Sequence, residues 1–118
     1  MAHNILIIDD EEDIRMLVAG ILEDEGYKTS VAADSDAALA ALESSPPPAL
    51  LILDIWLQGS TLDGMELLNV LRRLHPELPI IMISGHGNIE TAVSAIKLGA
   101  YDFIEKPFKS DRLLLQIT

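Results

Sequence analysis

Polar residues stand at the ends of several short apolar runs in this chain, and Asp54 is the least expected of them. It lies inside the run LLILDIWL, between Leu53 and Ile55. A carboxylate in such company is costly to remove from water unless a cation or hydrogen bonds compensate it. We therefore expect Asp54 at the tip of a buried strand rather than in the middle of the core. The other polar residues that end an apolar run are Asp9, Asp10, Ser84 and Lys106.

A group that combines Asp9, Asp10 and Asp54 has a definite chemistry. Carboxylates within a few ångströms of one another repel, which raises the pKa of at least one of them. A hard divalent cation relieves the repulsion, and oxygen ligands without histidine or cysteine indicate Mg²⁺ or Mn²⁺. Beside such a cation Asp54 can act as a nucleophile, while Lys106 can pair with an incoming phosphoryl group and Ser84 can hydrogen-bond it. The set predicts a phosphoryl-transfer site.

Each of these residues also has a simpler explanation. Asp10 fits the N-cap of a helix, in a first turn whose dipole favours acidic residues. Ser84 fits a loop, and Lys106 fits a surface ion pair. Their joint arrangement at separate strand ends favours the functional interpretation. His86 has no second histidine at ligand spacing and is expected to be a loop residue, and Trp56 is expected to be partly exposed.

Strands and helices must alternate along the chain to place these residues. Short, continuous apolar runs predict strands at 4–9, 27–33, 49–54, 80–84 and 101–106. Apolar residues spaced by three and four predict helices at 11–26, 34–45, 64–75, 89–99 and 109–118. Asp34 and Asp63 are predicted N-caps, and Gly26 and Gly99 are predicted helix ends. The last helix is apolar up to its final residues, which favours a helix truncated by the end of the chain.

The order of these elements predicts the fold class. Strands that are apolar throughout are typical of a parallel sheet with helices on both faces. With right-handed crossovers, this gives an α/β, flavodoxin-like, doubly wound domain whose five-stranded parallel sheet has the order 2-1-3-4-5 and five helices. Residues 1–118 are expected to form one domain, with the three prolines at 46–48 in a loop. In such sheets, sites form at the carboxyl ends of the strands.

Composition narrows the function classes. The net charge is −11, from 19 acidic and 8 basic residues, so the surface repels phosphate backbones and suits a cation or a basic partner. We expect no direct contact with nucleic acid. The chain has no cysteine, which excludes disulfides and thiolate metal sites. No apolar run is long enough to span a bilayer and the N-terminus lacks a signal sequence, so a cytoplasmic protein is expected.

Four motifs in this order, IIDDEEDI, LILDIW, IMISGH and DFIEKPF, resemble the receiver domain of bacterial two-component response regulators. The resemblance covers essentially all 118 residues. The segment SGHGNIETAVSAIKLGAYDFIEKPF is similar to the nitrogen-regulation (NtrC/NtrX-type) group, and most of all to the NtrX type. The resemblance implies a phosphoacceptor domain that controls a transcriptional output.

The resemblance also implies a role for each site residue. Asp54 is the phosphoacceptor, Asp10 a direct Mg²⁺ ligand, and Asp9 a ligand acting largely through water. The backbone carbonyl of Trp56 completes the metal site. By the same resemblance, Ser84 and Lys106 contact the phosphoryl group, and Ser84 and Phe103 act in the switch. The peptide bond between Lys106 and Pro107 is expected to be cis.

The implied partners follow from the same family. A sensor histidine kinase donates the phosphoryl group to Asp54. The face made by the fourth helix, the fifth strand and the fifth helix then changes, which alters homodimerisation or contacts with an output domain. The resemblance implies an ATPase domain and a helix-turn-helix DNA-binding domain as outputs, neither of which is in this chain. Nitrogen metabolism is the implied regulated process.

The sequence departs from the common receiver pattern in the segment QGSTLDG. Gln58 stands where most receivers have proline, and the Asp63–Gly64 pair comes about two residues later than usual. Phe103 replaces the tyrosine often found at the switch position.

Three other functions are alternatives for this sequence. An FMN-binding domain needs a phosphate-cradling loop after the first strand, where DDEEDI is acidic. A haloacid-dehalogenase-like phosphatase typically has a second aspartate two residues after the nucleophile, where Trp56 stands here. The third alternative is a receiver-like interaction module that acts without phosphorylation.

Overall fold

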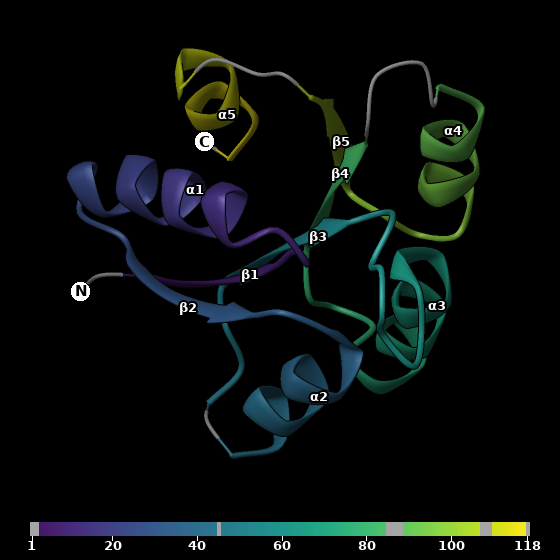
Figure 1. Ribbon diagram of the computed structural model, residues 1–118. Helices are drawn as coiled ribbons and strands as arrows, with labels where there is room; N and C mark the ends of the chain where they lie inside the picture. The colour runs from purple at the N-terminus through teal and green to yellow at the C-terminus, as the bar shows by residue number, and fades with distance from the viewer. Residues whose placement is uncertain (1–2, 45, 85–88, 107–109, 118) are drawn as a thin grey trace.

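Five parallel strands and five helices alternate along the described part of the chain (Figure 1). The computed structural model describes residues 3–44, 46–84, 89–106 and 110–117, with the backbone alone for Ser84 and Ile89. The strands are β1 (Asn4–Ile8), β2 (Lys28–Ala32), β3 (Leu50–Asp54), β4 (Ile80–Ser84) and β5 (Asp102–Glu105). The helices are α1 (Glu12–Asp24), α2 (Ser35–Ser44), α3 (Gly64–Leu74), α4 (Ile89–Lys97) and α5 (Ser110–Ile117).

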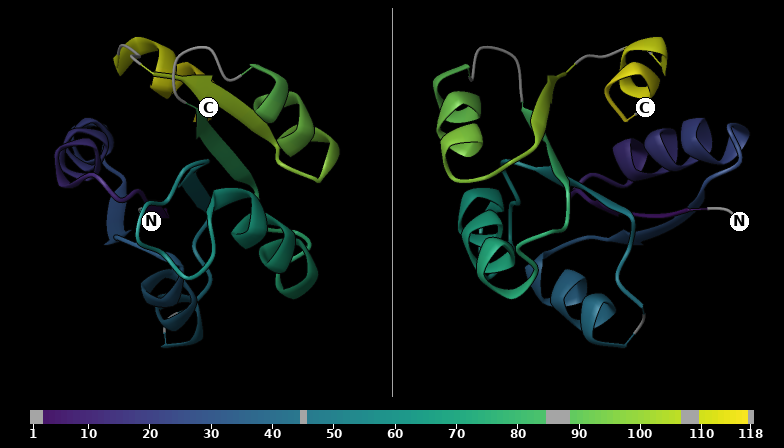
Figure 2. Two further views of the ribbon diagram at one scale, coloured as in Figure 1. Left: turned by 45° about the vertical axis from the view of Figure 1, so that its right-hand side comes forward. Right: turned by 180° about the vertical axis from the view of Figure 1, so that it is seen from behind.

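The sheet has the order β2-β1-β3-β4-β5, which confirms the flavodoxin-like topology. Helices α1 and α5 cover one face of the sheet, and α2, α3 and α4 cover the other (Figures 1 and 2). Alternate residues of each strand point to opposite faces, so β1 sends Ile5 and Ile7 toward α1 and Leu6 and Ile8 toward the other layer. Both layers are buried, which explains the continuous apolar runs of the central strands.

The helix ends were largely predictable. The Asp34 carboxylate accepts a 2.8 Å bond from the Ala37 N–H, as an N-cap does. Asp63 forms a capping box with Glu66, in which each side chain accepts from the other residue's backbone N–H. Gly26 follows α1 at φ +91°, a left-handed conformation that glycine adopts without strain.

The first turn of α1 does not use Asp10 as its N-cap, which was the simpler explanation of that residue. The N-cap is Glu11, and its side chain makes no capping bond. The Glu11 N–H is bonded instead to the Asp9 carboxylate at 2.9 Å. The carboxylate of Asp10 is therefore not used to begin the helix. No helix in the described ranges is long and apolar enough to cross a membrane.

Gly64, the first residue of α3, packs against the chain that leaves β3. Its N–H donates a 3.0 Å bond to the Ile55 carbonyl. A Cβ at this position would fall on the backbone carbonyl oxygens of Asp54 and Ile55, far inside van der Waals contact. The beginning of α3 can approach the end of β3 this closely because residue 64 has no side chain.

Gly64→Ala should lower the free energy of unfolding by about 2 to 4 kcal/mol, because the backbone on both sides would have to move. Urea unfolding followed by circular dichroism measures this. Gly20→Ala is the matched control, since Gly20 lies in α1 with no heavy atom within 4 Å of the new Cβ. It should leave stability unchanged or raise it by about 0.5 to 1 kcal/mol. Equal destabilisation by the two substitutions would contradict this account of Gly64.

Candidate functional site

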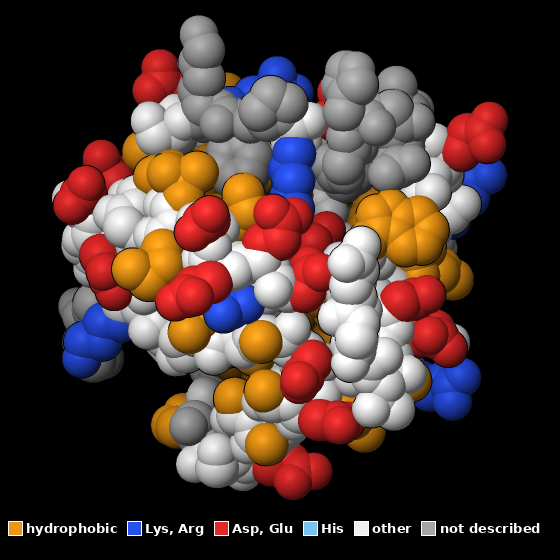
Figure 3. Space-filling model, in the orientation of Figure 1, with side chains coloured by type: hydrophobic (Ala, Val, Ile, Leu, Met, Phe, Trp, Pro, Cys, Tyr) orange, Lys and Arg blue, Asp and Glu red, His pale blue; other side chains and the backbone are white. Residues whose placement is uncertain are grey.

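The site lies at the carboxyl edge of the sheet, where the register of the strands brings separate parts of the sequence together. Ile8 of β1 pairs with Leu53 of β3, so the next residues, Asp9 and Asp54, end neighbouring strands. Ser84 of β4 pairs with Glu105 of β5, and Lys106 follows directly. Figure 3 shows acidic side chains gathered around a basic one on this face of the molecule.

Three carboxylates come close together at this edge. One carboxylate oxygen each from Asp9, Asp10 and Asp54 lie within 4.8 Å of one another. Asp9 is fully buried, Asp54 is 3% exposed, and Asp10 is half-buried. The structure therefore places together the acidic group that the sequence predicted.

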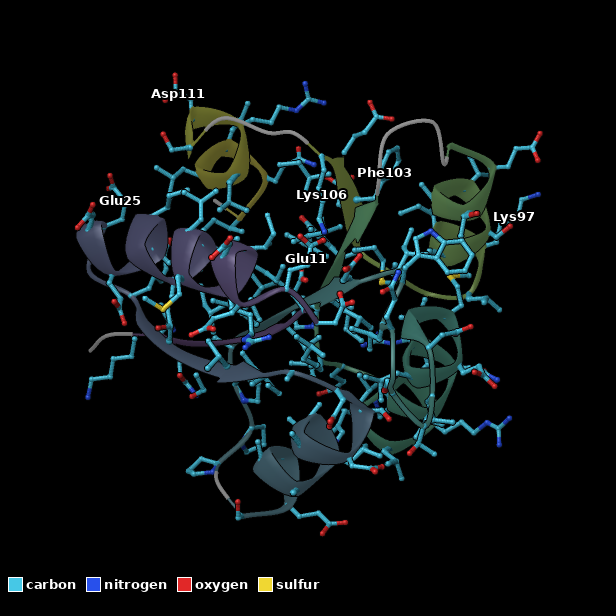
Figure 4. All side chains as sticks on the ribbon, viewed as in Figure 1. Glu11, Glu25, Lys97, Phe103, Lys106 and Asp111 are labelled. Carbon is cyan, nitrogen blue, oxygen red and sulfur yellow. The ribbon has the colours of Figure 1, made fainter. Side chains whose placement is uncertain are left out.

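Lys106 supplies the positive charge that faces these carboxylates. Its Nζ lies 3.4 Å from Asp54 Oδ2 and 3.4 Å from Asp9 Oδ2. The Glu11 carboxylate lies farther out, at 3.7 Å. Figure 4 shows Lys106 and Glu11 at this same edge. One ammonium group is thus shared among three carboxylates, which leaves a surplus of negative charge.

Backbone N–H groups hold each carboxylate of the group. The Trp56 N–H donates to Asp54 Oδ1 at 3.3 Å, and the Gln58 N–H donates to Asp10 Oδ2 at 3.3 Å. Asp9 Oδ1 accepts from the Glu11 N–H, as described above. The Asp9 carbonyl in turn accepts a 2.7 Å bond from the Arg15 guanidinium, which ties the loop after β1 to α1. These bonds fix the directions in which the carboxylates point.

Burial and mutual repulsion change the protonation of the group. Burial, followed by the negative charge of Asp9, raises the pKa of Asp54 from 3.8 to about 7, against the opposing effects of Lys106 and the Trp56 N–H. Burial also raises the pKa of Asp9, although the Glu11 N–H and Lys106 oppose it. Burial alone would lower the pKa of Lys106, but the carboxylates of Asp54, Asp9 and Glu11 raise it.

The donor set fits a hard divalent cation. Asp9 Oδ2 is buried and, among the described residues, accepts no hydrogen bond, since its approach to Lys106 at 3.4 Å is an ion pair without hydrogen-bond geometry. Such an atom is costly to bury unless a further partner compensates it. Carboxylate oxygens from Asp9, Asp10 and Asp54 are the ligands that Mg²⁺ and Mn²⁺ prefer. These are the residues that can hold a metal ion.

The remaining residues of interest lie around this group. Phe103 is half-buried on β5 and packs against the core, and its carbonyl accepts a 2.9 Å bond from Gln116 of α5. Trp56 is 51% exposed, as expected. Ser84 ends β4, but its hydroxyl, His86 and Pro107 lie outside the described residues, so the contacts of Ser84 and the Lys106–Pro107 peptide stay predictions.

Sequence reasoning missed three participants. Glu11 pairs with Lys106, a contact that its place in the acidic segment DDEEDI did not indicate. Arg15 reaches back to the Asp9 carbonyl, a contact that its place one turn into the helix could have suggested. Gln58 contacts Asp10 through its backbone N–H, and the type of side chain at a position does not indicate what its backbone N–H binds.

Comparisons with known proteins show which family the chain resembles. The model of the response regulator receiver domain family matches residues 5–118. The nitrogen assimilation regulatory protein NtrX of Azorhizobium caulinodans is 67% identical over 115 residues, which cover 98% of this chain and 25% of that protein. This chain thus spans about a quarter of the length of that relative.

Solved structures agree as well. A crystal structure of NtrX from Brucella abortus superposes with a TM-score of 0.94 at 67% identity, over 98% of this chain and 25% of that one. A crystal structure of the receiver domain of NtrX from Brucella abortus gives a TM-score of 0.92 at 68% identity, over 94% of this chain and 92% of that one.

The raised pKa of Asp54 leads to a prediction about stability. In the folded protein this pKa is about 7, above its ordinary value of 3.8, so ionising Asp54 costs more in the folded state than in the unfolded one. The cost is absent below pH 4, grows as the pH rises toward 7, and is constant above that. Asp54→Asn removes it. In the presence of a chelator, the variant should gain about 1 to 3 kcal/mol over the wild type between pH 4 and pH 8.

Chemical denaturation of both proteins across this pH range measures the difference. A difference that stays constant with pH, or that grows in favour of the wild type, would contradict the proposed cost of the buried Asp54 charge.

Proposed function

This chain belongs to the response regulator receiver domain family, and from this premise we propose that Asp54 accepts a phosphoryl group from a sensor histidine kinase. The observation that carries the proposal is the position of the Asp54 carboxylate. It ends β3 beside Asp9 and Asp10, with Lys106 Nζ at 3.4 Å. A buried aspartate that adjoins both a cation-binding group and a lysine is suited to nucleophilic attack on phosphorus.

The transfer forms one bond and breaks one bond. A carboxylate oxygen of Asp54 attacks the phosphorus atom of a phosphohistidine, the phosphorus–nitrogen bond breaks, and the imidazole leaves. The ion pair with Lys106 favours the ionised, nucleophilic form of Asp54. Lys106 also offers its ammonium to the oxygens of the transferred group.

We propose Mg²⁺, with Mn²⁺ as a substitute, as the cofactor. Asp9, Asp10, Asp54 and the backbone carbonyl of Trp56 would hold it. When bound, the cation supplies positive charge that neutralises the carboxylates and the phosphoryl oxygens. Asp9 Oδ2 supports this assignment, because it is buried and accepts no hydrogen bond within the described residues, although it pairs with Lys106.

The response to phosphorylation is also part of the proposal. Ser84 hydrogen-bonds the phosphoryl group and Phe103 changes rotamer. In both states the proposed Lys106–Pro107 peptide is cis. The α4-β5-α5 face then differs between the two states. In this role the chain is a regulatory phosphoacceptor that assists its own phosphorylation and dephosphorylation, and it acts on no separate substrate.

The wider setting rests on the relatives. We propose that residues 1–118 form the receiver domain of a cytoplasmic, NtrX-type regulator, whose further domains bind DNA and control transcription in nitrogen regulation. The receiver itself makes no contact with nucleic acid, in keeping with its net charge of −11. The alternative is an interaction module that acts without phosphorylation. A folded protein that acetyl phosphate does not phosphorylate would favour it.

Incubation with acetyl phosphate should add one phosphoryl group to the protein, in a reaction that requires Mg²⁺. Intact-mass spectrometry measures the adduct, and Asp54→Asn is the matched variant that should show none. Lys106→Met should slow the reaction by about 10-fold or more, because it removes a cation from the transition state. A folded wild-type protein without an adduct, or an adduct that persists in Asp54→Asn, would overturn the proposed role of Asp54.

We further propose that phosphorylation promotes a homodimer through the α4-β5-α5 face. The support is a group of apolar side chains on and after α4 that are 40% to 70% exposed: Val93, Ile96, Leu98 and Tyr101. Exposed apolar side chains that gather on one helix and the segment after it are typical of protein–protein interfaces.

Analytical ultracentrifugation of the phosphorylated protein should show a dimer, which Val93→Lys weakens by about 10-fold or more because it brings a charge into the apolar contact. Met16→Lys is the control, since Met16 is 68% exposed on α1, across the sheet from α4. A dimer that Met16→Lys disrupts and Val93→Lys does not would place the interface elsewhere.

A further inference from the structure

The segment between β3 and α3 has no regular secondary structure, yet it is tied to the molecule at several points. At its middle, the Ser60 hydroxyl accepts a 2.9 Å bond from the Ser35 N–H and donates a 2.9 Å bond to the Ser35 hydroxyl. The Ser35 hydroxyl also accepts a 3.0 Å bond from the Leu62 N–H. Ser35 is the first residue of α2 and is fully buried. The loop is thus fastened to the beginning of α2 by a closed set of hydrogen bonds.

The same loop reaches the acidic site at its beginning. The Trp56 N–H is bonded to Asp54, and the Gln58 N–H is bonded to Asp10. A donor on Asp10 Oδ2 fixes the plane of that carboxylate, while its second oxygen can ligate a cation. Two of the three carboxylates therefore take their orientation from this loop.

We infer that Ser35 and Ser60 are positioning residues for the cation site. By fixing the middle of the loop against α2, they hold the Gln58 N–H on Asp10 and the Trp56 backbone beside Asp54. The inference rests on the proposed function in one respect, which is that the three carboxylates bind a divalent cation. It extends the site to α2, an element that contributes no ligand.

The burial of Ser35 makes its contact with Ser60 suited to this role. Without the Ser35 hydroxyl, the Leu62 N–H and the Ser60 hydroxyl each lose a partner at a partly buried position, and an unpaired polar group that is removed from water is costly. The loop would then relax, because its internal backbone bond is long: the Ser60 N–H donates to the Leu57 carbonyl at 3.3 Å. The Thr61 hydroxyl also bonds α2, through Asp36 at 3.1 Å, but this contact is exposed and water can replace it.

Binding of Mg²⁺ to the unphosphorylated protein tests the inference. Isothermal titration calorimetry, supported by the fluorescence of the sole tryptophan, gives the dissociation constant. Ser60→Ala and Ser35→Ala should each raise it about fivefold, because they loosen a group that orients the ligands. Ser60→Thr keeps the hydroxyl and should bind Mg²⁺ with the wild-type dissociation constant, as should Thr61→Ala.

A readout without metal separates positioning from general stability. In the chelator-treated protein, NMR should show that the amide hydrogen of Gln58 exchanges about tenfold faster in Ser60→Ala than in the wild type, while the amides of β1 and β3 exchange as before. Folded Ser35→Ala and Ser60→Ala proteins with wild-type Mg²⁺ affinity and wild-type exchange at Gln58 would overturn the inference. Failure of the wild type itself to bind Mg²⁺ would overturn the proposed function instead, and exchange at Gln58 would still decide whether the serines fix the loop.

Discussion

Within the described residues, the carboxyl edge of the sheet holds more negative charge than Lys106 can balance. Asp9 and Asp54 are buried there, and both depend on Lys106 at 3.4 Å. Burial, together with the negative charge of Asp9, raises the pKa of Asp54 to about 7. A buried oxygen of Asp9 also accepts no hydrogen bond within the described residues. A proton, a divalent cation or a conformational change can relieve the surplus of negative charge, and in the proposed function the cation does so.

Holding such a group together requires the rest of the domain to be rigid. The central strands are buried on both faces, so they cannot shift to let the carboxylates separate. Gly64 lets α3 begin against the Asp54 and Ile55 carbonyls, and Ser35 fastens the intervening loop to α2. Each of these contacts lies outside the acidic group, yet each limits how far Asp10 or Asp54 can move. The domain is thus destabilised at the carboxyl edge of the sheet, and packing in the buried layers on both faces of the sheet offsets this cost.

Much of this arrangement could be predicted from the sequence, because a parallel sheet turns sequence order into spatial order. The alternation of apolar runs and periodic helices gave the order 2-1-3-4-5, and that order brings Asp9, Asp54 and Lys106 to one edge. What could not be predicted depends on loop conformation. The bond from Gln58 is made by a backbone N–H that nearly every residue type has, and the Ser35–Ser60 contact joins residues 25 positions apart through a loop without periodicity.

In the proposed function, the shared lysine offers a route by which phosphorylation of Asp54 could change the surface formed by β5 and α5. Lys106 follows β5 directly, so its ion pairs couple the acidic group to that strand. Three residues earlier, Phe103 packs against the core, and its carbonyl is bonded to Gln116 of α5. A phosphoryl group on Asp54 would give Lys106 a stronger partner and weaken its pairing with Asp9 and Glu11. Any displacement of β5 that follows is passed to α5 through the bond to Gln116. A difference of a few kcal/mol between two positions of β5 is enough to shift the populations of such a switch.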